Sequence, residues 1–429
     1  MGTTTPRLSS ATLAPEQAPP YDRSGAPAIL HLGVGAFARA HLGAYADELL
    51  RTGDDTLIHG VSLRSDVAER QLSPQDGLHT VTVREPAADE PPHVLGAFVR
   101  VSTGTDAAIA ALAAPRTRVV TLTVTEQGYD VDAAPAVLAA GLARRDPDLP
   151  APTVLSLDNL LDNGALLRSR VLRAARRQDP RLAEWIAAAV PFPGSVVDRM
   201  VPATTTADLD LVERRLGRRD EAAVVAEQHR SWVLERHESS GAGPAWEAAG
   251  VELVEDLGPY QRRKLWLLNL PHSALAYAGL LAGCDTIAEA VQHPVVGPFA
   301  TAVLHDAAEV VHAPDAASFA AGVLRRFANP ALGHTCAQVG AHGSRKLPER
   351  LVPVVAARRD RGLTSERLEL VAAIWSAAVE RVPLAGRVLP PVEDRSQVLD
   401  GAPPELLAAV AAARGRLERG GLAVVAEVV

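Results

Sequence analysis

Cysteine is nearly absent from this 429-residue chain, in which only Cys284 and Cys336 occur. Two cysteines cannot build a disulfide framework, and so few are typical of a protein kept in a reducing cytoplasm. Residues 1–25 have no long apolar run and are rich in Pro, Ser and Thr. We therefore expect a disordered leader over residues 1–26 rather than a secretory signal. No stretch approaches the roughly 18–20 apolar residues of a membrane span, so we expect no membrane partner.

A basic footprint is also missing. The net charge is −8, and arginine alternates with acidic residues rather than forming a long basic run. Nucleic-acid binding needs clustered positive charge, so we expect a small-molecule partner and no nucleic acid. A chain of this length, with 47% hydrophobic and 22% charged residues, is typical of a globular protein with two domains. We expect a monomer or a weak homo-oligomer.

Lysine is the scarcest of the charged residues. Of the 43 lysine and arginine residues only Lys264 and Lys346 are lysine. Arginine can replace lysine as a solvated charge, but a guanidinium stays protonated whereas a buried ammonium can lose its proton near neutral pH. The two lysines are therefore candidate functional groups, although drift alone could also have left them in place.

The stretch "AILHLGVGAFARAHLGAYADELL", residues Ala28 to Leu50, joins a strand-like run to a helix-like run through glycines. Gly33-x-Gly35-x-x-Ala38 has the spacing of a turn that seats a dinucleotide pyrophosphate. The same spacing also occurs in a simple strand-to-helix bend. The pattern alone leaves both interpretations open.

The first half of the chain alternates predicted strands and helices. This rhythm predicts a parallel sheet with helices on both faces. The predicted segments are strands at 28–35, 56–63, 79–85, 118–130 and 152–159, with helices at 38–50 and 164–177. After a predicted linker, "ESSGAGPAWEAAG" (238–250), the apolar spacing becomes that of helices. We expect a dinucleotide-type α/β domain over 27–240 and a mostly helical domain over 241–429.

Among the polar residues of the predicted helix "RRKLWLLNLPHSALAY", Lys264, Asn269 and His272 are spaced by five and then three residues. On a regular helix Lys264 and Asn269 would lie about 140° apart, so they converge only if the helix is irregular, and Pro271 supplies a reason for that. A neutral lysine can act as general base toward an alcohol, and an amide can stabilise the developing alkoxide. Asn269 bonded to backbone and His272 as a core histidine are the structural alternatives.

Two further motifs follow predicted strands. "LSLDNLLDNG" places Asp158 and Asn159 after a strand, where they fit either a ligand site or an Asx-type helix cap. "SVVDRMVP" places Asp198 and Arg199 after an apolar run, where they fit either a substrate contact or a structural ion pair.

These residues resemble the mannitol dehydrogenase family, the polyol-specific long-chain dehydrogenases and reductases that include fructuronate reductases. The resemblance covers roughly residues 28–360. Its blocks are "GVGAFARAH" (33–41), "TVTEQGYD" (123–130), "LDNLLDNG" (157–164), "VVDRMVP" (196–202), "KLWLLNLPHSALAY" (264–277) and "RRFANPAL…GSRKLPERL" (325–351). It implies a Rossmann-type doubly wound sheet followed by a helical substrate domain.

The resemblance also implies roles for individual residues. Lys264 would be the general base, and Asn159 and Asn269 would polarise the reacting oxygen. His272 and Asp198 would hold substrate hydroxyls or fix the site. The implied reaction is metal-independent hydride transfer between a secondary alcohol of a linear polyol or aldonate and its ketose, as in mannitol/fructose or mannonate/fructuronate.

Lys346 falls where the family has a cation near the substrate. The chain departs from the family pattern at Leu270–Pro271, where relatives carry small residues. It also departs at Gln261, where they often carry glutamate.

For the cofactor, the resemblance implies NAD, with NADP as the alternative. An acidic side chain after the second strand would bind the ribose hydroxyls of NAD, whereas arginine would pair with the 2′-phosphate of NADP. Here Arg64 and Asp66 both follow that strand. The candidate cofactor-binding residues are Gly33, Gly35, Ala36, Phe37, Ala38, Arg64, Asp66, Thr125 and Glu126.

Three other functions compete with this one. A mannitol-1-phosphate 5-dehydrogenase would use the same chemistry on a phosphorylated substrate. A zinc polyol dehydrogenase would need a Cys/His/Glu ligand set, which two scattered cysteines do not suggest. A non-catalytic dinucleotide-binding sensor would need the glycine turn but not the lysine.

Overall fold

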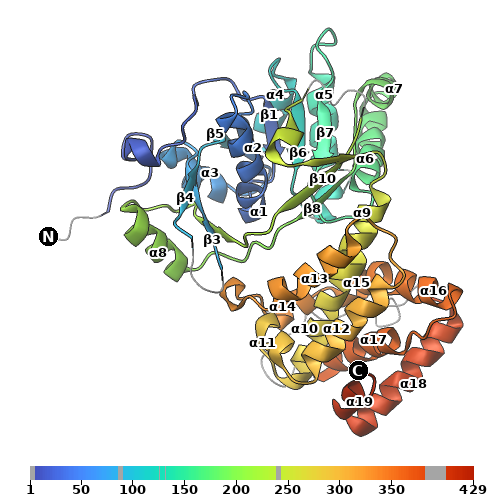
Figure 1. The fold of residues 1–429 in the computed structure, drawn as a ribbon. Coiled ribbons are helices and arrows are strands. Elements are labelled where there is room, and N and C mark those ends of the chain that lie inside the picture. The colour runs from blue at the N-terminus through green and yellow to red at the C-terminus, as the bar shows by residue number, and fades with distance from the viewer. Residues whose placement is uncertain (1–4, 86–89, 125, 131, 238–242, 382–401) are drawn as a thin grey trace. The chain divides into compact units, whose positions relative to one another are not determined.

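The computed structural model describes residues 5–85, 90–124, 126–130, 132–237, 243–381 and 402–429 (Figure 1). The chain divides into two compact units, Met1–Leu257 and Gly258–Val429, which are described separately. The predicted boundary at 240 therefore lies 17 residues before the observed one at 257.

The centre of unit 1 is a five-stranded parallel sheet in the order β5-β2-β1-β6-β7. Its strands are β1 (Ile29–Leu32), β2 (Ile58–Ser62), β5 (Phe98–Thr103), β6 (Val119–Leu122) and β7 (Thr153–Ser156). Chain order runs outward from β1 in both directions, so the sheet is doubly wound, as predicted. In such a sheet ligands bind beyond the carboxyl ends of the strands, near the point where the winding reverses.

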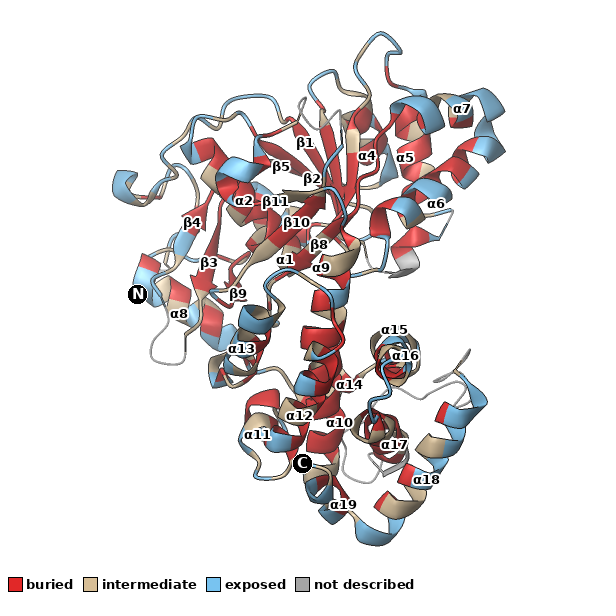
Figure 2. Cartoon of the chain, turned by 45° about the vertical axis from the view of Figure 1, so that its right-hand side comes forward, coloured by how far each residue is buried: buried red, intermediate tan, exposed pale blue. Residues whose placement is uncertain are grey.

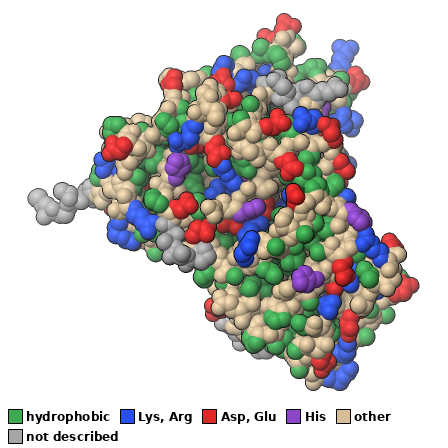
Figure 3. All heavy atoms as spheres, viewed as in Figure 1, with side chains coloured by type: hydrophobic (Ala, Val, Ile, Leu, Met, Phe, Trp, Pro, Cys, Tyr) green, Lys and Arg blue, Asp and Glu red, His purple; other side chains and the backbone are tan. Residues whose placement is uncertain are grey.

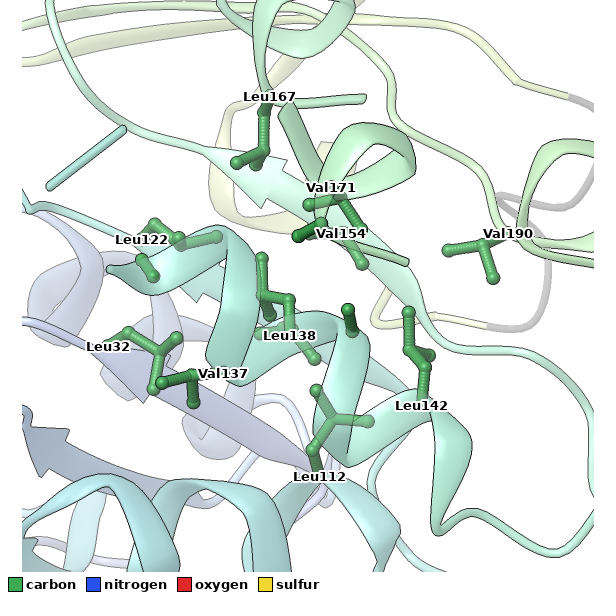
Figure 4. Close-up of a cluster of buried hydrophobic side chains, with 14 of the residues drawn as sticks. Leu32, Leu112, Leu122, Val137, Leu138, Leu142, Val154, Leu167, Val171 and Val190 are labelled. Carbon is green, nitrogen blue, oxygen red and sulfur yellow. The ribbon is translucent and has the colours of Figure 1, made fainter. Parts of the chain in front are cut away.

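Side chains alternate along each strand and supply two cores. One face packs against α4 (Thr105–Ala113), α5 (Ala134–Ala143), α6 (Asn163–Gln178) and α7 (Pro180–Ala189). Figure 4 shows this core, where Leu32, Leu122 and Val154 from three strands meet Leu138 of α5 and Val171 of α6. A period of two places alternate residues on opposite faces, which is why one apolar strand can serve both cores.

The other face packs against helices and a second sheet. Ile29, Ile58 and Leu155 point to this side, where they join residues of α2 (Leu42–Arg51) and α3 (Val67–Leu72). The helix predicted at 38–50 is observed as α1 (Ala36–Ala40) and α2, with a turn at His41. Trp232, from a strand of the second sheet, also belongs to this core.

Two three-stranded sheets complete unit 1, in the orders β11-β10-β8 and β4-β3-β9. Their strands are β3 (His79–Val83), β4 (His93–Leu95), β8 (Ser195–Asp198), β9 (Val224–Ala226), β10 (Ser231–Glu235) and β11 (Glu252–Val254), with α8 (Thr206–Leu216) alongside. The predicted linker is wrong in its described part. Trp246 is buried and its ring centroid lies 4.7 Å from that of Trp232, because β11 after it pairs with β10.

The leader predicted as disordered is folded over its described residues, 5–26. Leu8 is fully buried, and its backbone N–H donates to the Arg219 carbonyl at 2.9 Å. The Arg23 guanidinium donates to the Gly96 carbonyl at 2.8 Å. Its Pro/Ser/Thr composition predicted disorder, but buried apolar residues, Leu13 as well as Leu8, and arginine hydrogen bonds to backbone carbonyls fix it against the domain.

Unit 2 is helical throughout its described residues. Its helices are α9 (Gly258–Arg262), α10 (Leu270–Ala282), α11 (Ile287–Gln292), α12 (Val296–Ala308), α13 (Ala316–Phe327), α14 (Cys336–Gly340), α15 (Gly343–Arg350), α16 (Val352–Asp360), α17 (Glu366–Arg381), α18 (Pro404–Gly420) and α19 (Ala423–Glu427). α10 packs against α11, α12, α14 and α17 and is the most enclosed of them, as Figure 2 shows by its burial. It ends at Gly283, whose φ of +81° suits a glycine C-cap.

The helical stretch Gly258–Ala282 is 25 residues long and apolar enough, by composition, to cross a membrane. The expectation that no stretch reaches this length is therefore wrong. However, 78% of its most apolar window is buried inside the protein, as expected of a core helix. On the face seen in Figure 3, acidic and basic side chains are interspersed, in keeping with the mixed charge pattern of the sequence.

Candidate active site

The two glycines of the turn after β1 have different reasons to be glycine. Gly33 has φ +98°, and a Cβ there would lie 2.1 Å from the Thr123 carbonyl oxygen. The fold itself therefore requires glycine at 33. Gly35 is exposed and extended, with φ −85°, and a Cβ there would meet nothing within 4 Å. Because the described chain does not require glycine at 35, the open space in front of it is available to a ligand.

The turn is held from beneath by a histidine that sequence reasoning missed. The Gly33 carbonyl accepts from the Thr123 hydroxyl at 2.6 Å and lies 3.0 Å from His31 Nε2. The other ring nitrogen of His31 lies 2.8 Å from Thr121 Oγ1. Burial lowers the pKa of His31 to about 4, so the ring is neutral at physiological pH. Its signal in the sequence is a single polar residue inside the apolar run "ILHL".

After the turn, α1 begins at Ala36. Ala38 is fully buried, so the third position of the motif is small where helix and sheet are closest. The Phe37 ring stacks on His41 with centroids 4.8 Å apart. Arg39 donates to the Ala222 carbonyl at 2.7 Å, which fixes α1 to the neighbouring sheet.

The residues after β2 lie at the surface. Arg64 is exposed, and Asp66, which directly precedes α3, forms an exposed ion pair with Arg70 one turn later. An exposed i,i+4 pair contributes little, so Asp66 can exchange this partner for a ligand at low cost. Thr125 and the side chain of Glu126 lie outside the part of the chain that the structure describes.

At the end of β7, Asp158 performs a structural task. Its carboxylate accepts from the Val124 backbone N–H at 3.1 Å and from the Tyr129 hydroxyl at 2.9 Å. It therefore fastens the segment after β6 to the end of β7. Burial and the Asp158 charge raise the pKa of Tyr129 above its usual range, so the phenol remains a donor. Asn159, the predicted site residue, is exposed next to it.

Asn163 is a second residue that sequence reasoning missed. Its buried side chain donates to the Asp158 carbonyl at 3.0 Å and to the Ser195 carbonyl at 3.0 Å, and it accepts from the Ser195 N–H at 2.9 Å. It therefore joins the end of β7, just before Asn159, to the beginning of β8, the strand that Asp198 ends. The "DNG" motif was the signal, although it predicted only a turn.

Asp198 ends β8 and is 7% exposed. His229 Nε2 lies 3.4 Å from its carboxylate, a neighbour that the sequence did not indicate. The next residue, Arg199, donates to the Glu227 carbonyl at 3.1 Å and to the Ala40 carbonyl at 2.5 Å. Burial lowers the pKa of Arg199 to about 10, which still leaves it charged. These two bonds tie β8 to the end of α1; they go to backbone carbonyls, whereas the structural alternative suggested by the sequence was an ion pair.

In unit 2 the helix is π-wound over Arg263–Asn269, between α9 and α10. The Leu270 N–H bonds to the Leu265 carbonyl five residues back. In this winding residues five apart lie one above the other, so Lys264 and Asn269 share a face. The irregularity expected from Pro271 is thus present and immediately precedes it. π turns of this kind are rare and frequently mark functional sites.

His272 lies in the first turn of α10, three residues after Asn269, and so next to it on the helix surface. Its ring stacks on Phe327 of α13 with centroids 4.5 Å apart, and the His334 ring lies at 6.3 Å. Burial, followed by the positive charges of His334, Arg350, Lys346 and Arg326, lowers the pKa of His272 well below its usual value. His272 is therefore a neutral donor or acceptor in a positive environment.

Lys346 lies on α15 and is half-buried, with Nζ donating to the Val339 carbonyl at 3.3 Å. Its charge is among those that lower the pKa of His272. The structure therefore places Lys264, Asn269 and His272 along one stretch of helix in unit 2, and Lys346 acts electrostatically on His272. Gln261, the departure from the family's glutamate, is buried in α9.

A doubly wound nucleotide-type sheet, followed in the chain by a helical unit that carries a lysine, an amide and a histidine on one helix, fits a dinucleotide-dependent oxidoreductase. The comparisons with known proteins narrow this class. The model of the mannitol dehydrogenase Rossmann domain matches residues 27–248, and that of the mannitol dehydrogenase C-terminal domain matches residues 256–414. The chain belongs to the mannitol dehydrogenase family and is an oxidoreductase.

Individual relatives agree with this assignment. The chain is 34% identical to the D-mannonate oxidoreductase of Escherichia coli (strain K12), over 88% of this chain and 85% of the relative. It is 32% identical to a mannitol 2-dehydrogenase of Cereibacter sphaeroides, over 91% and 90%. Among solved structures, the Pseudomonas fluorescens mannitol 2-dehydrogenase ternary complex with NAD and D-mannitol superposes with a TM-score of 0.87 at 30% identity, covering 98% of this chain and 99% of that one.

Proposed function

We propose that this protein interconverts a secondary alcohol of a linear polyol or aldonate with the corresponding ketose, using NAD and Lys264 as general base. The π turn is the observation that carries this proposal. It places a lysine and an amide on one face of a core helix, next to a neutral histidine. A base and a hydrogen-bond donor side by side are what removal of a proton from an alcohol requires.

NAD fits the turn after β1. Gly35 is exposed, is not required by the fold, and leaves room for a pyrophosphate to approach the backbone. We expect Ala36 and Phe37 at the turn and Asp66 after β2 to contact it, whereas Ala38, which is fully buried, only lets α1 come close to the sheet. NAD, when bound, accepts the hydride from the alcohol carbon. Family membership and the NAD named in the mannitol 2-dehydrogenase complex support NAD over NADP.

The chain's own residues handle the proton and the oxygens. Lys264, in its neutral form, takes the hydroxyl proton onto Nζ. Asn269 and Asn159 donate amide N–H groups to the oxygen as it becomes negative. Asp198 accepts from a substrate hydroxyl, and neutral His272 orients another.

The positive charge around His272 favours a negatively charged substrate over a neutral one. The charges of Lys346 and Arg326 are among those that lower the pKa of His272, and cations hold a carboxylate better than a neutral hydroxyl. This supports an aldonate such as mannonate as the first substrate to test, with mannitol second. Mannitol 1-phosphate stays the alternative.

A cofactor-reduction screen tests the proposal. Mannitol, arabinitol, sorbitol, mannonate, altronate and mannitol 1-phosphate are each offered with NAD and with NADP, with and without a chelator. We expect chelator-resistant turnover of at least one unphosphorylated polyol or aldonate. Tight dinucleotide binding without turnover of any substrate would favour a sensor, and strict dependence on the phosphorylated substrate would overturn the ranking.

Exchanging Arg64 for glutamate tests cofactor preference. If Arg64 faces the adenosine ribose, Arg64→Glu should move the NAD/NADP ratio of kcat/KM toward NAD by about tenfold or more, since about 1.4 kcal/mol lost from one charged phosphate contact has that effect. Arg176→Glu, the same charge change on an exposed residue of α6, is the control. An unchanged ratio in Arg64→Glu would show that this side chain does not read the ribose.

A further inference from the structure

One face of α15 packs against the π turn and α10. Gly343, Lys346 and Arg350 are spaced by three and then four residues, so they lie on a single stripe. A Cβ at Gly343 would lie 2.0 Å from Trp375 Nε1 and 2.6 Å from Tyr277 Oη. The beginning of α15 is therefore in direct contact with α10 and α17, which fixes where the rest of the stripe must lie.

Arg350, at the other end of the stripe, reaches the junction between the π turn and α10. Its Nη1 donates to the Ser273 hydroxyl at 2.9 Å and to the Asn269 carbonyl at 3.3 Å. The Ser273 hydroxyl in turn donates to the same carbonyl at 3.0 Å. Ser273 is fully buried. These three groups form a closed network around the residue at which the π winding ends.

The junction needs support from outside the helix. Pro271 has no N–H, so the regular ladder of backbone hydrogen bonds is interrupted one residue into α10. The carbonyl that Pro271 leaves without a backbone donor is that of Leu267, four residues back, so Arg350 does not replace the missing bond. It instead holds the backbone two residues before Pro271 and the side chain two residues after it, on both sides of the interruption. The Arg350 guanidinium provides two donors in a fixed planar geometry, which a flexible ammonium would not reproduce.

We propose that Arg350 is a positioning residue for the reaction: by holding the Asn269 carbonyl and the Ser273 hydroxyl, it sets the rotation of the π turn against α10. That rotation decides where the Asn269 amide and the His272 ring are directed. This inference rests on the proposed function, in which both groups act on the substrate, and neither the family blocks nor the spacing of the motif assigned a role to Arg350.

Arg350 also contributes to the electrostatics of His272. The charged and titratable groups facing this ring are His334, Lys346 and Arg326 besides Arg350 itself. Burial lowers the pKa of Arg350 without removing its charge, and Glu349 and Tyr277 act in the opposite direction. Removing the Arg350 charge should raise the pKa of His272, so protonated His272 should appear at higher pH than in the unmodified protein.

The test compares Arg350→Met with Arg350→Lys, and uses Arg345→Met, an exposed arginine of the same helix, as the matched control. Arg350→Met should lower kcat by about 10- to 100-fold, the order expected for a misplaced catalytic group, with little change in NADH affinity. In the pH profile of kcat, the acid limb of Arg350→Met should lie at higher pH than that of the unmodified protein. Arg350→Lys should keep the acid limb in place and recover part of kcat, and Arg345→Met should behave like the unmodified protein.

Deuterium exchange over residues 263–275 separates failure of this inference from failure of the proposed function. Arg350→Met should speed exchange in this segment, and Arg345→Met should not. Unchanged exchange would overturn the proposal whatever the activity. A lower melting temperature with unchanged kcat and pH profile would overturn it too. If the unmodified protein turns over no substrate, the proposed function fails, and the exchange result alone decides whether Arg350 holds the π turn.

Discussion

Lys264→Ala should lower the rate of alcohol oxidation by about 10²- to 10⁴-fold, the range usual for a lost general base. Lys264→Arg should fail almost as badly, because a guanidinium does not release its proton and cannot accept one from the substrate. Dinucleotide affinity should hardly change in either variant, since the glycine turn belongs to unit 1. Steady-state kinetics and NADH titration measure the two effects separately.

The pH dependence of alcohol oxidation also tests whether Lys264 acts as the base. Only unprotonated Lys264 can take the hydroxyl proton, so oxidation should rise as the pH rises through the titration of its ammonium group, and reduction should use the protonated form. The unprotonated form of a small primary amine, added to Lys264→Ala, should restore part of the oxidation rate.

Arg262→Ala, an exposed cation two residues away, is the control and should keep full activity. Near-native turnover and pH profile in Lys264→Arg would show that Lys264 only positions charge, and His272 would become the next candidate for the base.

The role of Lys264 illustrates what sequence patterns can and cannot predict. The scarcity of lysine and the spacing of Lys264, Asn269 and His272 indicated the chemistry. The spacing also implied that a regular helix would keep Lys264 and Asn269 apart. Pro271 indicated an irregularity but not its kind, because a π turn depends on the packing of unit 2 and no local preference encodes it.

In unit 1, too, local features were predictable from the sequence and contacts between distant segments were not. The glycine turn and the doubly wound sheet were predictable because strand, turn and helix follow one another within the segment 28–50. His31 was not predicted to support the turn, because its partners Thr121 and Thr123 come from β6 and the segment after it, about 90 residues later in the chain. Trp246 was misread as part of a linker because the turn that contains it, Trp246–Ala249, packs against α2, far earlier in the chain.

The glycine turn provides the second large effect. Gly35→Val should leave unit 1 folded and abolish dinucleotide binding, because a branched side chain would occupy the space through which the pyrophosphate approaches the backbone. Folding should survive because Gly35 has an ordinary backbone conformation, with φ −85°, and a Cβ there meets nothing within 4 Å.

Gly33→Ala should have the opposite outcome and is the informative contrast. Its positive φ alone costs a non-glycine residue on the order of 1–3 kcal/mol, and the Cβ would collide with the Thr123 carbonyl, so the loss should appear first in the melting temperature. Gly322→Val, at a half-buried position of α13 where a Cβ also meets nothing within 4 Å, controls for the added side chain. Thermal melts and NADH fluorescence titrations on the three variants separate the two roles. Normal NADH affinity in folded Gly35→Val would place the pyrophosphate elsewhere, whereas loss of folding in that variant would mean that Gly35, like Gly33, serves the fold.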